Sequence, residues 1–399
     1  TLRCSRAQAT QAGQQVDAAD RLVVLGGKHL FEFDYVYGSE DEVNGRDPKS
    51  MFSDCVKPLV HGLFTGYSAT VLAYGQTGSG KTYTMGSLSN NAQEASVARC
   101  WGDEGNEDSS SSSSESSETQ SQQRGIIPRA VDELYSRLGS LSEGQEVCVR
   151  VSYVEIYNEE IRDLLAESEG SMGDAAIAAD EPQQLQRKGS GGGGSGSWRV
   201  PSDAREIQIR ESADGQVHLV GCTETEVTSK AHMAALFQKG VKLRSTSRTG
   251  MNKQSSRSHA IFTICVETTT KTKAAGADVV AEAEGEGQQR GIERLRAKIN
   301  LVDLAGSERV KRTLAEGSTF REGVSINKGL LALGTGISAL ATDQQGQQSA
   351  AVTASSDAES ASHVPYRDSK LTRILRDALG GNSKTCLLYT SDAADDFVR

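Results

Sequence analysis

The chain of 399 residues carries 43 Lys and Arg against 53 Asp and Glu, a formal net charge of -10, and 36% of its residues are hydrophobic. No apolar run reaches the roughly 18 to 20 residues that a helix needs to cross a bilayer, and the first ten residues do not resemble a signal peptide. The seven cysteines are scattered and never spaced C-x-x-C, which disfavours a disulfide scaffold and a zinc finger. We therefore expect neither a membrane protein nor a secreted one.

Four stretches rich in Ser, Gly, Gln, Ala and acidic residues interrupt the chain and hold most of its negative charge. Such compositions cannot bury enough apolar surface to offset their ordering entropy, so we expect disordered insertions at 87–124, 166–205, 268–292 and 342–362. They fall between predicted elements, which indicates one interrupted domain over residues 1–385. The remainder is mildly basic. The small excess of Lys and Arg over Asp and Glu in this remainder either favours an acidic partner or has no function.

The predicted elements alternate between strands and helices along the chain. Their apolar spacing gives a strand at 31–37, a helix at 47–66, a strand at 69–74, a helix from 125, strands at 147–156, 260–266 and 298–303, and a helix at 324–341. The continuous apolar runs are typical of strands buried on both faces. The pattern predicts an α/β fold with a central, mostly parallel twisted sheet and helices on both faces.

Residues 75–82 read Gly-Gln-Thr-Gly-Ser-Gly-Lys-Thr and fit G-x-x-x-x-G-K-[ST] directly after a predicted strand. The glycines allow backbone N–H groups to surround a β-phosphate, and the following helix adds its dipole. The lysine would reach the β- and γ-phosphate oxygens, and the threonine hydroxyl would bind Mg²⁺. The sequence therefore predicts a P-loop NTPase that binds a nucleoside triphosphate through Gly75, Gln76, Thr77, Gly78, Ser79, Gly80, Lys81 and Thr82.

Two further polar motifs stand beside predicted strands. Residues 252–259 read Asn-Lys-Gln-Ser-Ser-Arg-Ser-His before one strand, and residues 303–308 read Asp-Leu-Ala-Gly-Ser-Glu after another. Either motif alone could be an ordinary capped turn. Together with the P-loop they predict three phosphate-sensing loops at neighbouring strand ends. For His259 a structural hydrogen bond is the favoured role over proton transfer.

At these three motifs the chain resembles the kinesin motor domain, over about residues 30–385 apart from the insertions. Segments 153–160, 221–224, 326–334 and 363–373 agree with it, and details at 67–75 and 311–317 look most like the chromokinesin-like class. The resemblance implies a microtubule-stimulated ATPase that uses Mg²⁺ and moves along microtubules in the cytoplasm, on the cytoskeleton. A dimer would form through a stalk beyond residue 399.

The resemblance also implies roles for single residues. Ser255 and Ser256 would close over the γ-phosphate, with the Ser256 hydroxyl on Mg²⁺ and Asp303 holding the metal through water. The Gly306 amide would sense the γ-phosphate. Glu308 would pair with Arg257 when the loops close and help to position the attacking water, and Tyr83 would contact adenine.

A long helix at 324–341 would transmit the state of these loops. Its predicted buried stripe consists of Ile326, Leu330, Leu331, Leu333, Ile337 and Leu340. The resemblance places tubulin contacts at Arg309, Arg312, Lys328, Arg367, Lys370 and Arg373, while the residues alone also allow a merely solvated cationic face. Nucleic acid is a weaker candidate partner, because no aromatic stacking platform is evident.

Two alternatives to a motor ATPase are a non-motile, nucleotide-gated microtubule-binding module and a P-loop GTPase. All the named catalytic positions are present, which argues against an inactive module. The guanine-reading Asn-Lys-x-Asp motif is not found, because the Asn-Lys pairs at 252–253 and 327–328 lack the final Asp.

The two ends depart from the family pattern. Residues 1–19 hold no Arg-x-Arg-Pro motif, so we expect the first strand of the sheet to be missing. After Thr385 the family continues with a last core strand and a helix, whereas residues 386–396 can be encoded by a transposase sequencing adapter. We therefore expect 386–399 to be a non-native tail and the chain to be a fragment, and the sequence leaves open whether this fragment folds alone.

Overall fold

The structure is a computed structural model, and it describes residues 22–25, 29–37, 50–86, 124–141, 145–166, 206–212, 215–246, 256–272, 291–308, 317–350, 364–380 and 382–389. Its strands are β1 (Leu22–Leu25), β2 (His29–Glu32), β3 (Ser68–Tyr74), β4 (Gln145–Tyr157), β5 (Glu160–Asp163), β6 (Gln208–Glu211), β7 (Val217–Val220), β8 (Thr225–Glu226), β9 (His259–Thr272), β10 (Gly291–Asp303) and β11 (Ser383–Tyr389). Its helices are η3 (Phe52–Val56), α1 (Lys57–Leu63), α2 (Lys81–Met85), α5 (Ile126–Leu138), α6 (Lys230–Thr246), α7 (Gly317–Ala350), η6 (Tyr366–Asp368), α8 (Lys370–Ile374) and α9 (Arg376–Leu379). None of the helices in this described part is long and apolar enough to cross a membrane.

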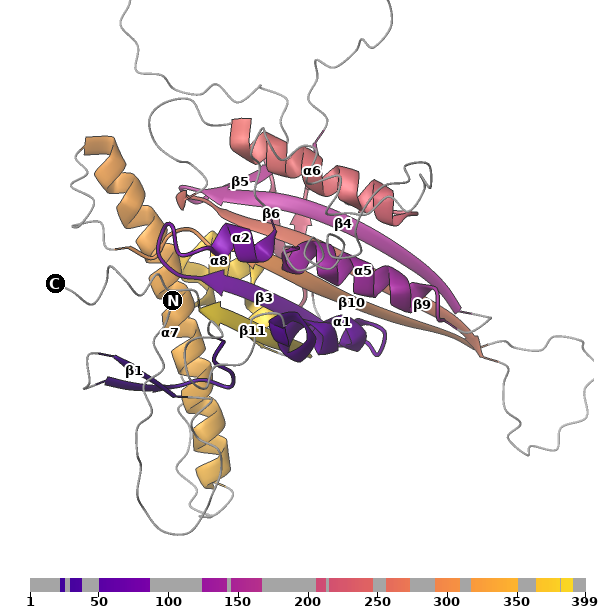
Figure 1. Cartoon of the computed structure of the whole chain (residues 1–399), viewed down its shortest axis with the longest axis horizontal. Helices are drawn as coiled ribbons and strands as arrows, with labels where there is room; N and C mark the ends of the chain where they lie inside the picture. Colours follow the sequence, from indigo (N-terminus) through magenta and orange to yellow (C-terminus); the bar gives the residue numbers. More distant parts are fainter. Residues whose placement is uncertain are drawn as a thin grey trace, which may run out of the picture.

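A seven-stranded sheet forms the centre of the molecule (Figure 1). Its order is β11-β3-β10-β9-β4-β5, with β8 paired to β4 beside this path. β11, β3 and β10 are parallel, whereas β9 is antiparallel to both β10 and β4. The sheet is therefore mixed, and β11, β3, β10 and β4 all run in one direction. Asp303 at the end of β10 pairs in register with Ala73 on β3, so the loops that follow these strands begin at the same edge.

Helices cover both faces of this sheet, as the sequence predicts. Buried residues of α1, α5 and α6 pack with Val71 and Ala73 of β3 on one face. Buried residues of α7, α8 and α9 pack with Leu72 of β3 on the other. Because β3 is covered on both sides, five consecutive residues of it are buried, which explains its continuous apolar run.

Several predicted boundaries are corrected by the structure. The strand predicted at 31–37 corresponds to β2, which ends at Glu32. The helix predicted at 47–66 begins as a π-helix, η3, and ends at Leu63. A Thr-rich segment extends β9 to Thr272, because β-branched residues suit a strand. The polar but proline-free residues 342–350 extend α7 to Ala350. The remaining parts of the four predicted insertions lie outside the described residues, at 87–123, 167–205, 273–290 and 351–362.

The sheet ends at β11, which pairs with β3 from Ser383↔Ser68 to Tyr389↔Tyr74. The expectation that the last core strand is absent is therefore wrong, because residues 386–389 complete it. Cys386 and Leu388 face the core while the alternate residues are exposed, as the twofold period of a strand requires. The adapter origin of residues 386–399 stays a prediction, since a strand position does not depend on where its codons came from. Residues 1–21, where the first strand was expected to be missing, lie outside the described part.

Candidate nucleotide site

The loop between β3 and α2 adopts a backbone conformation that its glycines permit. Gly78 and Gly80 have φ angles of +89° and +92°, in the left-handed region that disfavours other residues. A Cβ at either position would meet no atom within 4 Å. The glycines are therefore required by the turn and not by crowding, and open space lies beside the loop. Of the predicted residues 75–82, the first six form the loop after β3, and Lys81 and Thr82 begin α2.

Lys81 lies beneath this loop. Its side chain is buried, and its Nζ donates to the carbonyl oxygens of Gly75 at 2.8 Å and Gln76 at 2.7 Å. Burial lowers the pKa of Lys81, and the carboxylates of Asp303 and Glu308 act in the opposite direction. Because both hydrogen-bond acceptors are neutral carbonyls, the ammonium keeps its positive charge available to an anion above the loop.

Two of the three residues predicted to hold Mg²⁺ are in contact, Thr82 on α2 and Asp303 at the end of β10. The Thr82 hydroxyl donates to Asp303 Oδ2 at 2.9 Å. Asp303 is buried, and among the described residues its Oδ1 has no hydrogen-bond partner. A hydroxyl and a carboxylate oxygen are the hard ligands that Mg²⁺ prefers, directly or through water. This donor set, with one buried oxygen left over, fits the ion.

Asp303 has a buried partner that the sequence analysis missed. Arg244 on α6 donates from Nη1 to Asp303 Oδ2 at 2.8 Å and from Nη2 to the Ser258 carbonyl at 3.1 Å. Its Nε lies 3.9 Å from Oε1 of the fully buried Glu155. Gly240, one turn earlier, lets α6 approach β4, since a Cβ there would come within 2.1 Å of the Tyr153 ring. A glutamate in the middle of the apolar strand 153–157 was the available signal, because a buried carboxylate requires a cation nearby.

The three motifs meet through backbone hydrogen bonds. The Gly306 N–H donates to the Ser256 carbonyl at 2.8 Å, which joins the 303–308 loop to the 252–259 loop. The Ser307 N–H donates to the Gly75 carbonyl at 3.1 Å, which joins the 303–308 loop to the P-loop. The predicted meeting of three loops at neighbouring strand ends is confirmed. Ser255, the other predicted γ-phosphate contact, lies outside the described residues.

Glu308 and Arg257 are not paired with each other in this structure. The Glu308 carboxylate accepts from the backbone N–H of Thr77 at 2.9 Å and from its hydroxyl at 2.6 Å. Arg257 instead donates to Glu322 on α7 at 2.8 Å. Both charged groups have other partners here, so the pairing of Glu308 with Arg257 on closure of the loops stays a prediction. A Cβ on Gly306 would come within 2.2 Å of Glu308 Oε2, the end of a flexible side chain, so a larger residue here would displace the Glu308 carboxylate.

His259 has the structural role that the sequence analysis favoured. Its Nδ1 accepts from the Ala305 N–H at 3.1 Å, and the ring is buried. Burial, together with the positive charges of Arg244 and Lys81, lowers the pKa of His259 to about 3. The imidazole therefore stays neutral at physiological pH and holds the start of the 303–308 loop.

The predicted tubulin contacts lie on or beside α7 and α8, which pack together on one face of the sheet (Figure 1). Lys328 on α7 and Arg367 in η6 are exposed, whereas Lys370 and Arg373 on α8 are half-buried. Arg373 Nη2 donates to the Ile209 carbonyl of β6 at 3.3 Å. Arg309 and Arg312 lie outside the described residues. On α2, Tyr83 is 57% exposed and accessible to a base.

One residue of the predicted α7 stripe is misplaced. Ile326, Leu330 and Leu333 are buried, and Ile337 packs against them, but Leu331 is 71% exposed. Leu331 follows Val324 and Lys328 at spacings of seven and three, so the helical period turns it to their exposed side.

Comparison with known proteins gives one consistent result. The family model described as the kinesin motor domain matches residues 3–398. Kinesin-like protein KIN-4A of Oryza sativa subsp. japonica is 43% identical over 370 residues, which cover 92% of this chain and 30% of the relative. Chromosome-associated kinesin KIF4 of Mus musculus is 37% identical over 373 residues, covering 94% and 23%. The chain thus spans less than a third of the length of these curated relatives.

Solved structures agree on the fold. A structure of a KIF14 dimer with AMP-PNP in complex with a microtubule has a TM-score of 0.63 at 30% identity, covering 94% of this chain and 81% of that one. A structure of a fast kinesin has a TM-score of 0.59 at 32% identity, covering 91% and 74%. The predicted P-loop NTPase fold and the predicted likeness to chromokinesin-like relatives are confirmed.

Proposed function

Because the chain belongs to the kinesin motor-domain family, we propose that it is an ATP-hydrolysing motor domain that binds and moves along microtubules. The meeting of the three loops is the observation that carries this proposal. The 303–308 loop is hydrogen-bonded to the P-loop on one side and to the 252–259 loop on the other. A group bound over the P-loop therefore acts on all three at once.

Different residues of the chain would bind the phosphates, the adenine and Mg²⁺. The P-loop backbone, the Lys81 ammonium and the N-terminus of α2 would hold the β- and γ-phosphates, and Tyr83 would contact adenine. Thr82, Ser256 and Asp303 would hold Mg²⁺, with Asp303 acting through water. The ion supplies charge neutralisation at the phosphates. Arg244 fixes the orientation of Asp303, so this carboxylate is positioned before nucleotide binds.

Hydrolysis requires a water molecule aligned with the γ-phosphate, and Glu308 is the residue placed to orient it. Its present contacts with Thr77 put the carboxylate beside the P-loop. With a γ-phosphate bound, Ser255 would contact it and the Gly306 N–H would exchange the Ser256 carbonyl for a phosphate oxygen. Arg257 would then leave Glu322 and pair with Glu308. Positioning and charge neutralisation, rather than covalent chemistry, supply the rate in such sites.

The same exchange connects the site to α7. Glu322 lies in α7, upstream of the exposed residues Val324, Lys328 and Leu331. When Glu322 holds or releases Arg257, the position of α7 changes, and α7 carries the predicted tubulin contact Lys328. Shifts or order–disorder changes of this kind are typical of γ-phosphate sensing. Arg309, Arg312, Arg367, Lys370 and Arg373 would add contacts to acidic tubulin. One structural relative is a dimer bound to a microtubule, and we extend dimerisation, cytoplasmic localisation and association with the cytoskeleton to this protein as part of the proposal.

Steady-state ATP turnover, measured with and without microtubules, tests the proposal. We expect slow basal turnover and strong stimulation by microtubules, because lattice binding should favour the closed arrangement of the loops. Turnover by the folded protein that microtubules leave unchanged would contradict the motor assignment and favour the nucleotide-gated binding module.

A further inference from the structure

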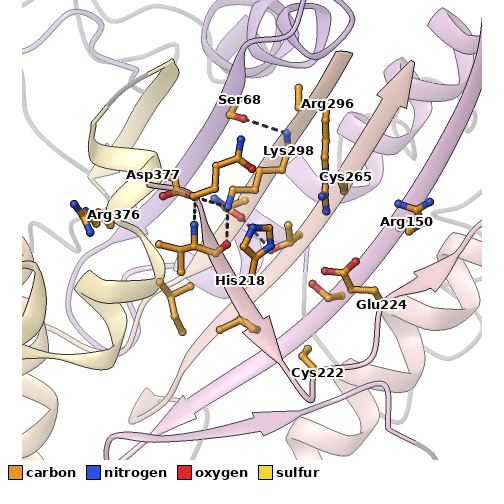
Figure 2. Close-up of a pocket in the computed structure, with 18 of the residues that line it drawn as sticks. Ser68, Arg150, His218, Cys222, Glu224, Cys265, Arg296, Lys298, Arg376 and Asp377 are labelled. Atoms are coloured by element: carbon orange, nitrogen blue, oxygen red, sulfur yellow. Dashed lines mark hydrogen bonds and ion pairs between the residues drawn. The ribbon is translucent and has the colours of Figure 1, made fainter. Parts of the chain in front are cut away.

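A cavity outside the nucleotide loops lies against the middle of the central sheet. It has a volume of about 500 Å³ and is lined by Ser68, the first residue of β3, and by adjoining parts of β4, β9 and β10. The β6–β7 hairpin and helix α9 complete its walls (Figure 2). The nucleotide loops follow the last residues of β3 and β10, whereas the cavity reaches β3 only at Ser68 and β10 at Arg296 to Asn300, which precede Asp303 by three to seven residues.

The floor of this cavity is polar although it belongs to a covered sheet face. Near the nucleotide loops that face is an apolar row across four strands, formed by Val154, Ile261, Val302 and Leu72. The next row on the same face, one step of two residues farther from the nucleotide loops, is polar. It consists of Ser152, Thr263, Asn300 and Thr70. A further step of two gives Arg150, Cys265 and Lys298, with Ser68 hydrogen-bonded beside Lys298. Polar side chains under a covering hairpin require polar partners.

Cations exceed carboxylates in the lining of the cavity. The charged lining residues are Arg150, Arg296, Lys298 and Arg376 against Glu224 and Asp377. Arg150 donates to Glu267 at 3.1 Å, while Arg296 donates from Nε to Cys265 Sγ at 3.3 Å. Within the described part of the chain, Arg296 forms no ion pair with a carboxylate. The hydrogen bond to Cys265 raises the pKa of Arg296, and the charges of Glu224 and Glu267 act in the same direction. A guanidinium that is not ion-paired is suited to bidentate binding of a phosphate or a carboxylate.

Lys298 has a different, structural task. Its Nζ donates to Asp377 Oδ2 on α9 at 2.8 Å, and the same oxygen accepts from the Val217 N–H of β7 at 2.9 Å. This contact ties the floor, the wall and the hairpin together, as the dashed lines in Figure 2 show. Arg296 is therefore the residue that would recognise an incoming anion. Arg150 on β4, which pairs with Cys265 on β9, would assist it.

We propose that this cavity binds a small metabolite-sized anion that carries a phosphate or a carboxylate group. The volume lies in the range of small-molecule sites. The anionic group would contact Arg296 and Arg150, and the hydroxyl groups of Ser152 and Thr263 would face the polar remainder of the ligand. Asn300 supports Thr263 from below, because its Oδ1 accepts from the Thr263 hydroxyl at 3.0 Å and its Nδ2 donates to the Thr70 hydroxyl at 3.1 Å. Nothing in the nucleotide chemistry uses these residues.

Occupancy of the cavity would also reach the predicted microtubule face. Tyr366 and Ile374, which flank the predicted contacts Arg367, Lys370 and Arg373, line the cavity. Arg373 in addition holds the hairpin through the Ile209 carbonyl. This coupling rests on the proposed motor function, and because coupling is reciprocal, microtubules would change the affinity for the anion as much as the anion changes theirs.

Alkylation of Cys265 reports binding directly, because its thiol lines the cavity. The protein is saturated with MgADP to block the P-loop and treated with iodoacetamide, and the Cys265 peptide is followed by mass spectrometry. Glucose 6-phosphate is the phosphate probe, tricarballylate the carboxylate probe and glucose the neutral control. At a probe concentration about ten times its Kd, we expect Cys265 alkylation to slow about tenfold.

Calorimetry on a matched pair of variants identifies the anion contact. Arg296→Gln should weaken probe binding about tenfold, because a charge-assisted contact is lost. Arg294→Gln, an exposed residue two positions away on the same strand but outside the lining, should bind like the unmodified chain. Both side chains are exposed, so neither change should unfold the protein.

Each outcome decides the matter. Protection by one charged probe alone supports the site and identifies a phosphate or a carboxylate ligand, and protection by both supports a general anion site. Protection by neither, equal protection by glucose, or undiminished binding to Arg296→Gln overturns the proposal. A probe that binds but leaves microtubule affinity unchanged removes the coupling alone. These binding measurements need no microtubules, so failure of microtubule-stimulated turnover would contradict the motor function and leave the anion site standing.

Discussion

The nucleotide site and the predicted microtubule face differ in how deeply their charged side chains are buried. At the nucleotide site, Asp303, Arg244 and Lys81 are each at most 6% exposed, and each makes short hydrogen bonds inside the protein. On the predicted microtubule face, Lys328 and Arg367 are exposed. Charges buried in a low-dielectric interior interact strongly and depend on geometry, whereas exposed charges are weakened by water and by salt. Substitutions should therefore cost catalysis and stability at the first region, but only affinity at the second.

The largest effect is expected from Glu308→Ala. If Glu308 orients the attacking water, ATP hydrolysis should fall by several orders of magnitude while nucleotide binding stays near normal. Single-turnover hydrolysis and equilibrium binding of a fluorescent ATP analogue measure the two quantities separately. Thr77→Val is the matched control, because it removes one hydroxyl contact to Glu308 and keeps the carboxylate. Normal turnover by Glu308→Ala would remove this residue from the mechanism.

The next effect concerns stability. Arg244→Ala leaves Asp303 and Glu155 buried without their cation, and removing one partner of such a cluster costs about 3 to 5 kcal/mol. Chemical denaturation in the absence of nucleotide measures this loss in the free energy of unfolding. Arg367→Ala, an exposed residue on the other region, should change it by less than about 0.5 kcal/mol. Equal effects of the two changes would show that burial does not distinguish the two regions.

The pH dependence of stability should also arise at the buried site. The folded pKa of His259 is about 3 and its ordinary value is 6.5, so between these values only the unfolded chain binds the proton. Stability from this residue is therefore complete above pH 6.5 and is lost as the pH falls, by about 2 kcal/mol between pH 6.5 and 5. Denaturation curves of the unmodified chain and of His259→Asn should converge over this range. A constant difference between them would contradict the shift in the pKa of His259.

The sequence predicted where the loop before α2 lies because the signal for it is local. The glycines, lysine and threonine of 75–82 are contiguous, and a strand before them fixes their place in the fold. Arg244 could not be found in this way, because its partners Asp303 and Glu155 are 59 and 89 positions away and meet it only through packing of α6 on the sheet. Gly240, which allows that packing, carries no motif.

Two other differences have physical causes of the same kind. Leu331 was assigned to a buried stripe because it is apolar, although its helical phase places it beside exposed Lys328. The Glu308–Arg257 pair was expected from the closed loops, yet each side chain has an alternative partner, Thr77 and Glu322 respectively. A sequence shows which charges exist, but the choice between near-equivalent partners is made by the arrangement of the loops.

The smallest effect is expected on the predicted microtubule face. Replacing Arg367, Lys370 and Arg373 by Ala together should weaken microtubule affinity about tenfold, since surface charge contacts contribute up to about 1 kcal/mol each and are not fully additive. Cosedimentation over a series of salt concentrations measures the change, and the salt dependence should become flatter because fewer charges are screened. Arg137→Ala, an exposed arginine on α5 at the opposite sheet face, should leave both quantities unaltered. Undiminished affinity of the triple variant at low salt would refute the assignment of this face, because low salt is the condition under which exposed charges act most strongly.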